Sequence, residues 1–395
     1  MLNSYKNTIK SVLNVFPYFI EYDKGLVKNF FKTKFTKTVL VSYLIPPTND
    51  FAKLDYTHTN VRECFTALEI FKTLGYNIDI VNYASKKRID YTKYSIIYGF
   101  GQPYERSFYQ SHKLHRIGYM TGCNPWFAND LSTFKVKDFY RKTGILAVYS
   151  SRVVDFRWNF FGTMSDLIIV LGNAQTEQTL LMRDSDIKTQ IISSFFNDVG
   201  KIDLETKNFE RAKTNFLWFG SSGLLHKGLD ICLDIFAERS DITLHICGAS
   251  KDETDFWKHY EPLIANKANI INHGFLDIKS VQFKQILMQC ATILAPSVSE
   301  GGAPALIQVC ATGGLMPVFT KYAGVNLDHF GIMMESPTIA AIGAAIDSVL
   351  LKSGTEMKEN AKKTANFVQE NYTFAQYKNT LQKYISHELN NIKQQ

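Results

Sequence analysis

The 395-residue sequence lacks long apolar runs, paired cysteines and any tract rich in proline or glycine. A membrane-spanning helix needs roughly 20 apolar residues, and the stretch from Ser11 to Ile20 is too short and is interrupted by Asn14 and Pro17. No small-residue cleavage site follows it. With 45% hydrophobic and 21% charged residues, the composition is that of a folded globular protein. We therefore expect neither a spanning helix nor a cleaved signal.

The six cysteines form no Cys-x-x-Cys pair, and no histidine lies at metal-ligand spacing from any of them: Cys64, Cys123, Cys232, Cys247, Cys290 and Cys310. A metal site or a disulfide framework needs such spacing. We expect reduced core cysteines in a cytoplasmic protein, with no metal site and no cofactor.

Positive charge is concentrated at the N-terminus. The net charge is +7, and residues 1–38 hold seven lysines against two carboxylates, a local net charge of +5. This distribution argues against nucleic-acid binding over a domain face and indicates a basic arm, residues 1–37. Its apolar residues fall at helical spacing: Val27, Phe30, Phe31 and Phe35. Two interpretations stay open: a helix lying on the anionic inner face of the cell membrane, or aromatic side chains packed on the first domain.

Short apolar runs alternate with segments long enough to hold helices, which predicts parallel sheets covered by helices. The first series of strands is expected at residues 38–45, 77–81, 94–98, 116–120, 166–171 and 190–193, with a helix at 60–74. The second is expected at 215–219, 242–246, 269–272, 291–295 and 315–319, with helices at 227–238, 278–289 and 304–312.

The expected fold is therefore α/β, with two doubly wound Rossmann-like domains facing a cleft. We place the first domain at residues 38–205 and the second at 206–372. Residues 373–395 have a helical pattern with no strand after it.

The segment from Ser299 to Pro304 has the pattern of an anion site. A buried apolar run leads into Glu300, Gly301, Gly302 and Ala303, and Pro304 suits the first turn of a helix. Glycines let a ligand approach the backbone, and the N–H groups and dipole of a helix N-terminus favour phosphate.

With the strand before it and the helix and strand after it, this segment resembles the family 4 glycosyltransferases of the GT-B fold over most of the C-terminal half. The resemblance implies a Glu-x7-Glu motif whose first carboxylate contacts the donor sugar and whose second contacts the ribose. Glu300 matches the first, but Gln308 stands at the second position. It also implies a C-terminal helix that crosses back to the first domain.

A second match begins at Phe216 and runs through Gly220 and Gly223 to Lys227, Gly228, Leu229 and Asp230. It resembles the family's glycine loop and phosphate-binding lysine, so Lys227 is expected to neutralise the leaving diphosphate. The family has arginine five residues before this lysine, where the chain has Ser222. His226, or a residue of the first domain, is expected to supply the missing charge.

Weaker signals complete the predicted site. Gly248 and Phe275 each follow an expected strand where the family's backbone approaches the nucleotide or base. On the acceptor side, His58, Gly101 and Thr121 lie in loops after strands of the first domain. Each of these residues could also be part of an ordinary turn.

The resemblance implies a retaining, metal-independent transfer of a sugar from a nucleoside diphosphate to a glycan or a lipid-linked acceptor, in surface polysaccharide or lipopolysaccharide synthesis. Two alternatives share the fold: a sugar-nucleotide epimerase or phosphorylase, and a non-catalytic partner subunit. The second is raised by Ser222 and Gln308, which replace charged residues of the family pattern.

Overall fold

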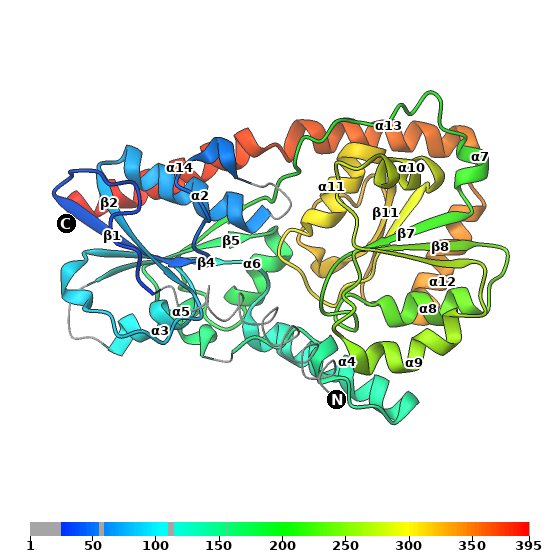
Figure 1. Cartoon of the computed structure of the whole chain (residues 1–395), viewed down its shortest axis with the longest axis horizontal. Helices are drawn as coiled ribbons and strands as arrows, with labels where there is room; N and C mark the ends of the chain where they lie inside the picture. The colour runs from blue at the N-terminus through cyan, green and yellow to red at the C-terminus, as the bar shows by residue number, and fades with distance from the viewer. Residues whose placement is uncertain (1–24, 55–58, 110–113, 156, 395) are drawn as a thin grey trace, which may run out of the picture. The chain divides into compact units, whose positions relative to one another are not determined.

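The computed structural model describes residues 25–54, 59–109, 114–155 and 157–394. Its strands form two six-stranded sheets flanked by helices (Figure 1). The first has the order β2-β1-β3-β4-β5-β6, with β1 Lys37–Tyr43, β2 Tyr76–Asn82, β3 Ile96–Gly99, β4 His115–Met120, β5 Leu167–Leu171 and β6 Thr189–Ile192. The second has the order β12-β11-β10-β7-β8-β9, with β7 Asn215–Phe219, β8 Thr243–Cys247, β9 Ile270–Gly274, β10 Thr292–Ala295, β11 Met316–Thr320 and β12 Ile332–Met334. The predicted α/β fold is confirmed.

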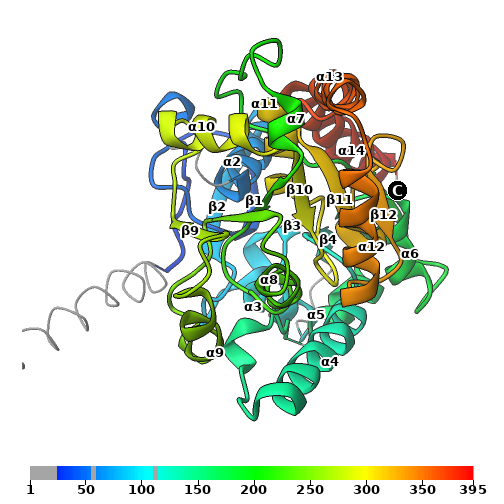
Figure 2. The ribbon, with the colours of Figure 1, turned by 90° about the vertical axis from the view of Figure 1, so that its right-hand side faces the viewer.

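The central strands of the second sheet, β7, β8, β10 and β11, are buried on both faces, which explains why they are mostly apolar. Phe216 and Trp218 of β7 join a core with α8 (Leu229–Ala237), α9 (Thr254–Ile264) and α12 (Ile339–Leu350). Leu217, between them, joins the opposite core with α10 (Val281–Gln289) and α11 (Pro304–Gly313). Figure 2 shows these helices around the sheet. All six cysteines are buried and free of disulfides, as predicted.

The remaining helices are α2 Thr59–Thr73, α3 Gln102–Arg106, α4 Pro125–Thr143, α5 Trp158–Met164, α6 Ala174–Leu181, α7 Phe209–Ala212, α13 Gly354–Asn371 and α14 Phe374–Gln394. By packing, the described residues form two compact units: one holds those up to residue 119 with 160–169 and 382–394, and the other holds those of 120–159 and 170–381. The last strand of the first sheet ends at Ile192 and the first strand of the second begins at Asn215. The predicted domain boundary near residue 205 stays a prediction.

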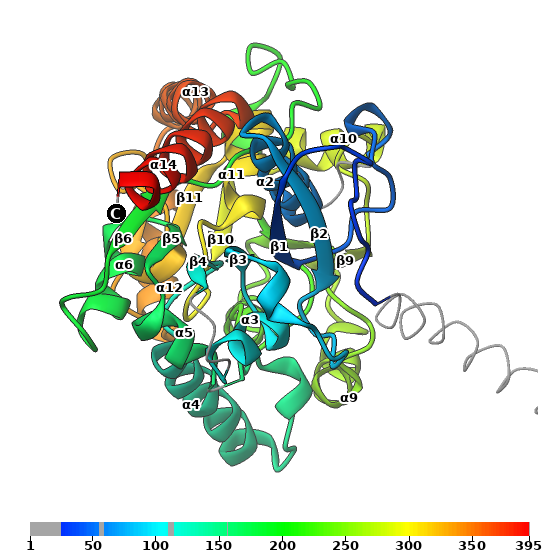
Figure 3. The same cartoon turned by 90° about the vertical axis from the view of Figure 1, so that its left-hand side faces the viewer.

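The C-terminal helix returns to the first unit, as predicted. Its residues up to Leu381 belong to the second unit, and the residues from Gln382 belong to the first. Within the first unit, Glu388 accepts a hydrogen bond from the His115 ring at 3.0 Å. Figure 3 shows α14 with the strands of the first sheet. Among the described residues, no helix has the length and apolar character needed to cross a membrane.

The helical interpretation of the arm is wrong for its described part, residues 25–37. Val27 exchanges two backbone hydrogen bonds with Ile80 of β2, at 2.8 and 2.9 Å, and the Phe30 N–H donates to the Ile78 carbonyl at 2.8 Å. The Phe31 ring packs edge-on against Phe65, with centroids 5.7 Å apart. The free edge of β2 competes with helix formation because it offers backbone partners to an extended segment. Residues 1–24 lie outside the described part of the chain.

Candidate functional site

The glycine loop between β7 and α8 is closely packed. Gly223 has φ of +83° and Gly228 has φ of +68°, values that favour glycine. A Cβ on Gly220 would lie 3.1 Å from Cδ of Lys227, and one on Gly228 would lie 2.5 Å from the Pro296 carbonyl oxygen. Because α8 begins at Leu229, two residues later than predicted, Lys227 lies in the loop and not in the helix.

Glu253 fixes this loop, and sequence reasoning missed it. Its buried carboxylate accepts hydrogen bonds from the Gly223 N–H and, at 2.9 Å, from the Leu224 N–H. Burial raises the pKa of Glu253, while these two N–H groups oppose the rise. These two loop amides are therefore already committed to a carboxylate.

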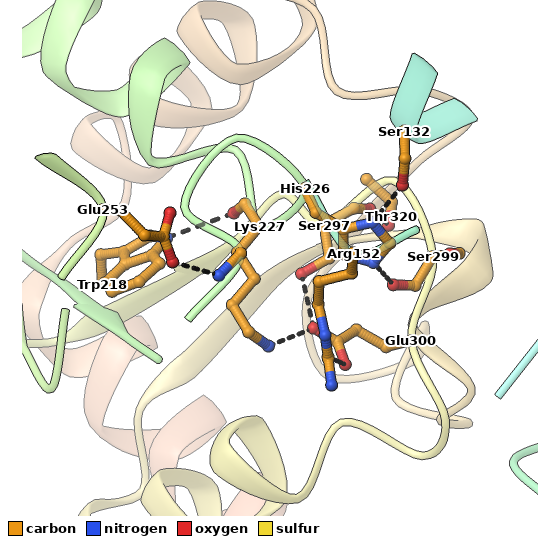
Figure 4. A network of polar contacts seen from close by, with 11 residues as sticks. Ser132, Arg152, Trp218, His226, Lys227, Glu253, Ser297, Ser299, Glu300 and Thr320 are labelled. Carbon is orange, nitrogen blue, oxygen red and sulfur yellow. Dashed lines mark hydrogen bonds and ion pairs between the residues drawn. The ribbon is translucent and has the colours of Figure 1, made fainter. Parts of the chain in front are cut away.

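Lys227 and Glu300 form an ion pair at the carboxyl ends of neighbouring strands. Lys227 follows β7 and Glu300 follows β10, which pairs with β7 in parallel. Their side chains are 15% and 10% exposed, and Lys227 Nζ donates to Glu300 Oε1. Burial lowers the pKa of Lys227, and the charge of Glu300 opposes this shift. Both residues predicted to carry the chemistry thus meet in one place, shown in Figure 4.

Glu300 has further partners that keep it ionised. Ser297 Oγ donates to Oε1 at 3.1 Å, and a guanidinium nitrogen of Arg152 lies 3.4 Å from Oε2. Burial acts to raise the pKa of Glu300, but the charges of Lys227 and Arg152 outweigh it and lower the pKa to about 2. The Glu300 carboxylate therefore accepts hydrogen bonds near pH 7 and has no proton to donate.

The backbone after Glu300 leads into the N-terminus of α11. A Cβ on Gly301 would lie 1.8 Å from the Thr121 carbonyl oxygen, so only glycine fits there. Gly302 has φ of +72°, and Ala303, the N-cap of α11, has φ of +33°. Left-handed backbone at a residue other than glycine costs about 1–3 kcal/mol and clusters at ligand sites. Pro304 is the first residue of the helix, as predicted.

Arg152 supplies a second cation. A residue of the predicted first domain, residues 38–205, was one of the two expected sources of this charge, but the sequence did not single out Arg152. It lies 148 residues from Glu300 in the chain, so local motif spacing carries no signal for it. Its side chain packs over the glycine loop, where a Cβ on Gly223 would lie 2.4 Å from Cγ of Arg152. The stem of the Arg152 side chain therefore packs against the loop at Gly223, next in sequence to Ser222, the position where the family pattern has arginine.

His226 does not supply this positive charge. Its Nε2 lies 2.6 Å from the Ser299 carbonyl oxygen, and its Nδ1 lies 2.8 Å from Ser132 Oγ. Since a carbonyl only accepts, Nε2 carries the proton and Nδ1 accepts from the Ser132 hydroxyl. Burial lowers the pKa of His226 to about 4. The ring is thus neutral near pH 7 and ties the loop of Glu300 to α4.

We predict that His226 makes the protein less stable in mild acid. The pKa of His226 is 6.5 in the unfolded chain and about 4 in the folded protein. Its contribution to the stability of the folded state is therefore fully present above pH 6.5 and is lost as the pH falls. Between pH 7 and 5 the loss is about 2 kcal/mol of unfolding free energy. Urea unfolding at both pH values should show a smaller loss in His226→Gln, whereas His329→Gln, at an exposed histidine, should match the wild type. Equal losses in all three proteins would contradict the prediction.

The Gln308 side chain is fully engaged with protein. Its Oε1 accepts from the Asn197 N–H at 2.9 Å, and its Nε2 donates to the Asn197 carbonyl at 3.0 Å and to Thr312 Oγ1 at 2.9 Å. These bonds tie the segment before α7 to α11. A ribose contact at Gln308, the position of the family's second carboxylate, stays a prediction, and it would use the second lone pair of Oε1.

We predict that Gln308→Glu weakens folding, because a carboxylate oxygen would then face the Asn197 carbonyl that the amide now contacts. The expected loss is about 1–3 kcal/mol of unfolding free energy, measured by urea unfolding. Gln285→Glu, at an exposed position of α10, serves as the matched control. Unchanged stability together with tighter binding of UDP would instead assign position 308 to the ribose.

The other predicted donor residues lie at the ends of β8 and β9. Gly248 has φ of +83°, and a Cβ there would lie 2.4 Å from the Gly220 carbonyl oxygen. Its N–H donates to the Gly274 carbonyl at 2.7 Å. Phe275, the next residue, is 73% exposed. Gly248 thus adjoins the glycine loop, and the exposed Phe275 ring is available to stack on a base.

The three acceptor-side predictions have different outcomes. His58 lies outside the described residues. Gly101, with φ of +86°, caps α3 and adjoins the backbone of Tyr83, so its contacts within the first unit are those of a turn. Thr121 directly adjoins Gly301 in the second unit. Of these three, Thr121 is the residue brought to the loop of Glu300.

In the part of the chain that the structure describes, no group of three or more His, Cys, Asp or Glu residues is arranged to hold a metal ion. The charged centre of the site consists instead of Lys227, Arg152 and Glu300, beside the N-terminus of α11. A site with two cations, one ionised carboxylate and a helix N-terminus suits an anionic ligand that carries hydroxyl groups.

Comparison with solved structures shows that the chain has the GT-B fold. It is similar to a sucrose-phosphate synthase from Thermosynechococcus elongatus, with a TM-score of 0.61 and 12% identity over 90% of this chain and 98% of the other. HepE of Anabaena, solved with UDP-glucose, matches with a TM-score of 0.57 and 13% identity over 89% and 99% of the two chains. A trehalose-6-phosphate synthase, described as transferring with retention, matches with a TM-score of 0.55 and 10% identity over 89% and 98%. No protein-family model matches the sequence, and no curated protein matches it.

Proposed function

We propose that this chain is a glycosyltransferase that moves a sugar from a nucleoside diphosphate to a hydroxyl group of a glycan or a lipid-linked acceptor, in surface polysaccharide or lipopolysaccharide synthesis. The observation that carries the proposal is the meeting of Lys227, Arg152 and Glu300 at the carboxyl ends of β7 and β10. Ligands of such sheets bind at this end. The solved GT-B structures with UDP-glucose support the donor class.

The two cations fit the role of stabilising the leaving group. As the bond between the anomeric carbon and the diphosphate oxygen breaks, its electron pair passes to that oxygen, and Lys227 and Arg152 offset the developing charge. Lys227 is 15% exposed, so its charge is weakly screened by water. The Lys227 ammonium has three N–H donors, so it can contact the departing diphosphate while it stays paired with Glu300.

Glu300 fits the role of holding the sugar. A carboxylate that stays ionised down to a pKa of about 2 accepts hydrogen bonds from sugar hydroxyls and cannot act as a general acid near pH 7. We propose that the acceptor oxygen attacks the anomeric carbon from the side of the departing diphosphate. The hydroxyl proton passes to that diphosphate, so the configuration is retained without an enzyme nucleophile or a metal.

A thermal-shift panel of UDP-, GDP- and ADP-sugars tests this proposal. We expect one nucleotide series to raise the Tm of the wild type, and its shift to disappear in Lys227→Ala and shrink in Glu300→Ala. Lys258→Ala, at an exposed lysine of α9, should retain the wild-type shift. No shift with any nucleotide sugar would favour the non-catalytic partner subunit, and epimerised donor or sugar phosphate formed without an acceptor would favour the epimerase or phosphorylase.

A further inference from the structure

An apolar groove lies next to the site, between α4 and the segment that follows it. The groove has a volume of about 540 Å³, and its lining includes Tyr140, Leu146, Val148, Tyr149 and Val153. These five side chains are between 45% and 79% exposed. Exposed apolar residues scattered singly need no explanation, but a continuous apolar groove marks a binding surface.

The body beneath the groove is firmly held, so the apolar lining is not a loosely packed edge. Phe139, on the inner face of α4, stacks against Phe256 with ring centroids 6.1 Å apart. Lys135 of α4 donates to the buried Asp230 at 2.6 Å. One face of α4 is therefore fixed to α8 and α9, and the opposite face contributes Tyr140 and Lys137 to the groove.

The groove and the proposed active site share a short strip of chain, residues 150–153. Ser151 and Val153 line it, while Arg152 between them reaches Glu300 at 3.4 Å. The Ser150 carbonyl accepts hydrogen bonds from the N–H groups of Leu225 and His226 in the glycine loop, at 3.0 and 3.3 Å. One short strip of chain thus forms a wall of the groove and carries a cation of the site.

The charges at the groove select among amphiphilic ligands. Lys137 is the charged residue of the lining, which contains no aspartate or glutamate. Arg141, one helical turn along α4 from Lys137, is also exposed. An apolar wall with a cation beside it complements a hydrocarbon chain that ends in a phosphate.

We infer that this groove binds the hydrocarbon chain of a lipid-linked acceptor, in which a phosphate joins the chain to the glycan that carries the hydroxyl group, and that Lys137 meets this phosphate. The inference rests on the proposed function, because it places the acceptor end next to Arg152 and Glu300. Burying apolar surface stabilises binding by roughly 25 cal/mol per Å², so a chain of several isoprene or alkyl units gains more from this groove than a water-soluble glycan does.

Isothermal titration with farnesyl phosphate, kept below its aggregation concentration, tests the inference. We expect saturable 1:1 binding to the wild type and none with inorganic phosphate. Leu146→Asp and Val153→Asp should weaken binding at least tenfold, and Lys137→Gln should weaken it severalfold. Leu351→Asp replaces a leucine that is 88% exposed beyond the end of α12, so it is the matched control and should bind as the wild type does.

Four results would overturn the inference. The first is farnesyl phosphate binding that is undiminished in both groove variants, and the second is an equal loss of that binding in Leu351→Asp. The third is that the groove variants lose binding to phosphatidylglycerol vesicles but keep binding to farnesyl phosphate. The fourth is a wild-type dimer that Leu146→Asp converts to a monomer. The last two would assign the surface to a membrane or to a second copy of the chain. Nucleotide-sugar thermal shifts, measured on the same variants, keep the two proposals separate. If no nucleotide sugar raises the Tm of the wild type, the proposed function is wrong, whatever the titration with farnesyl phosphate shows.

Discussion

Lys227→Met is expected to lower kcat by about 10²- to 10³-fold, the loss found when one group that stabilises transition-state charge is removed. Lys227 contacts Glu300 now and would contact the diphosphate as the sugar leaves. Methionine keeps much of the length and volume of the side chain and removes only its charge. Release of nucleoside diphosphate, measured with the donor that the thermal-shift panel identifies, reports the effect.

Loss of folding must be separated from loss of chemistry in this variant. Breaking a buried ion pair by removing one partner typically costs about 3–5 kcal/mol, so Lys227→Met should also melt at a lower temperature. Lys227→Met combined with Glu300→Gln removes both charges and should recover part of that stability without recovering turnover. If the double variant regained wild-type turnover, Lys227 would have no role beyond folding.

Arg152→Ser is expected to lower kcat/KM by about 10- to 100-fold. This effect is smaller than the one expected for Lys227→Met, because the Arg152 side chain is about half exposed and its charge is therefore better screened by water. The stronger test is rescue. Arg152 crosses the loop at Gly223, next in sequence to Ser222, the position where the family pattern has arginine, so we expect an arginine at position 222 to supply the missing charge. Ser222→Arg in the Arg152→Ser background should restore at least tenfold of the lost kcat/KM.

The rescue distinguishes a charge that acts on the ligand from one that acts only on the fold. Arg211→Ser, at an exposed arginine of α7, is the control and should leave kcat/KM unchanged. Ser222→Lys should rescue less than Ser222→Arg, because a lysine side chain is shorter and cannot form a bidentate contact with phosphate. Failure of both Ser222 variants, with folding intact, would mean that Arg152 is needed for its ion pair with Glu300 alone.

The fold could be predicted from the sequence because its strands are short apolar runs at regular spacing. β7 lies at the predicted residues, and the other strands of the second sheet that were predicted differ by at most two residues at each end. β12 was missed, since three residues, Ile332–Met334, are too few to show a period. Of the two interpretations of the arm, the helical one failed because apolar residues at helical spacing also occur in an extended segment, whose backbone bonds here go to β2.

The site was only partly predictable from the sequence, because some of its residues lie far along the chain from the motifs that mark it. Glu300 and Lys227 stand within local motifs, and the parallel pairing of β7 with β10 brings them together. Arg152 and Glu253 come from loops whose approach to the glycine loop depends on how α4 and α9 pack. The burial that makes His226 neutral likewise follows from the packing of Ser132 and Ser299 around its ring, which composition and spacing do not reveal.

Isothermal titration of UDP into the wild type and into Lys227→Met tests most directly whether the second sheet carries a binding site for a nucleoside diphosphate. We predict 1:1 binding to the wild type, at least tenfold weaker binding to Lys227→Met, and no binding of uridine, which lacks the diphosphate. The titration is repeated with GDP and ADP, because the base is not part of the prediction. Absence of binding by all three diphosphates, or equal binding to wild type and variant, would contradict the assignment of this site.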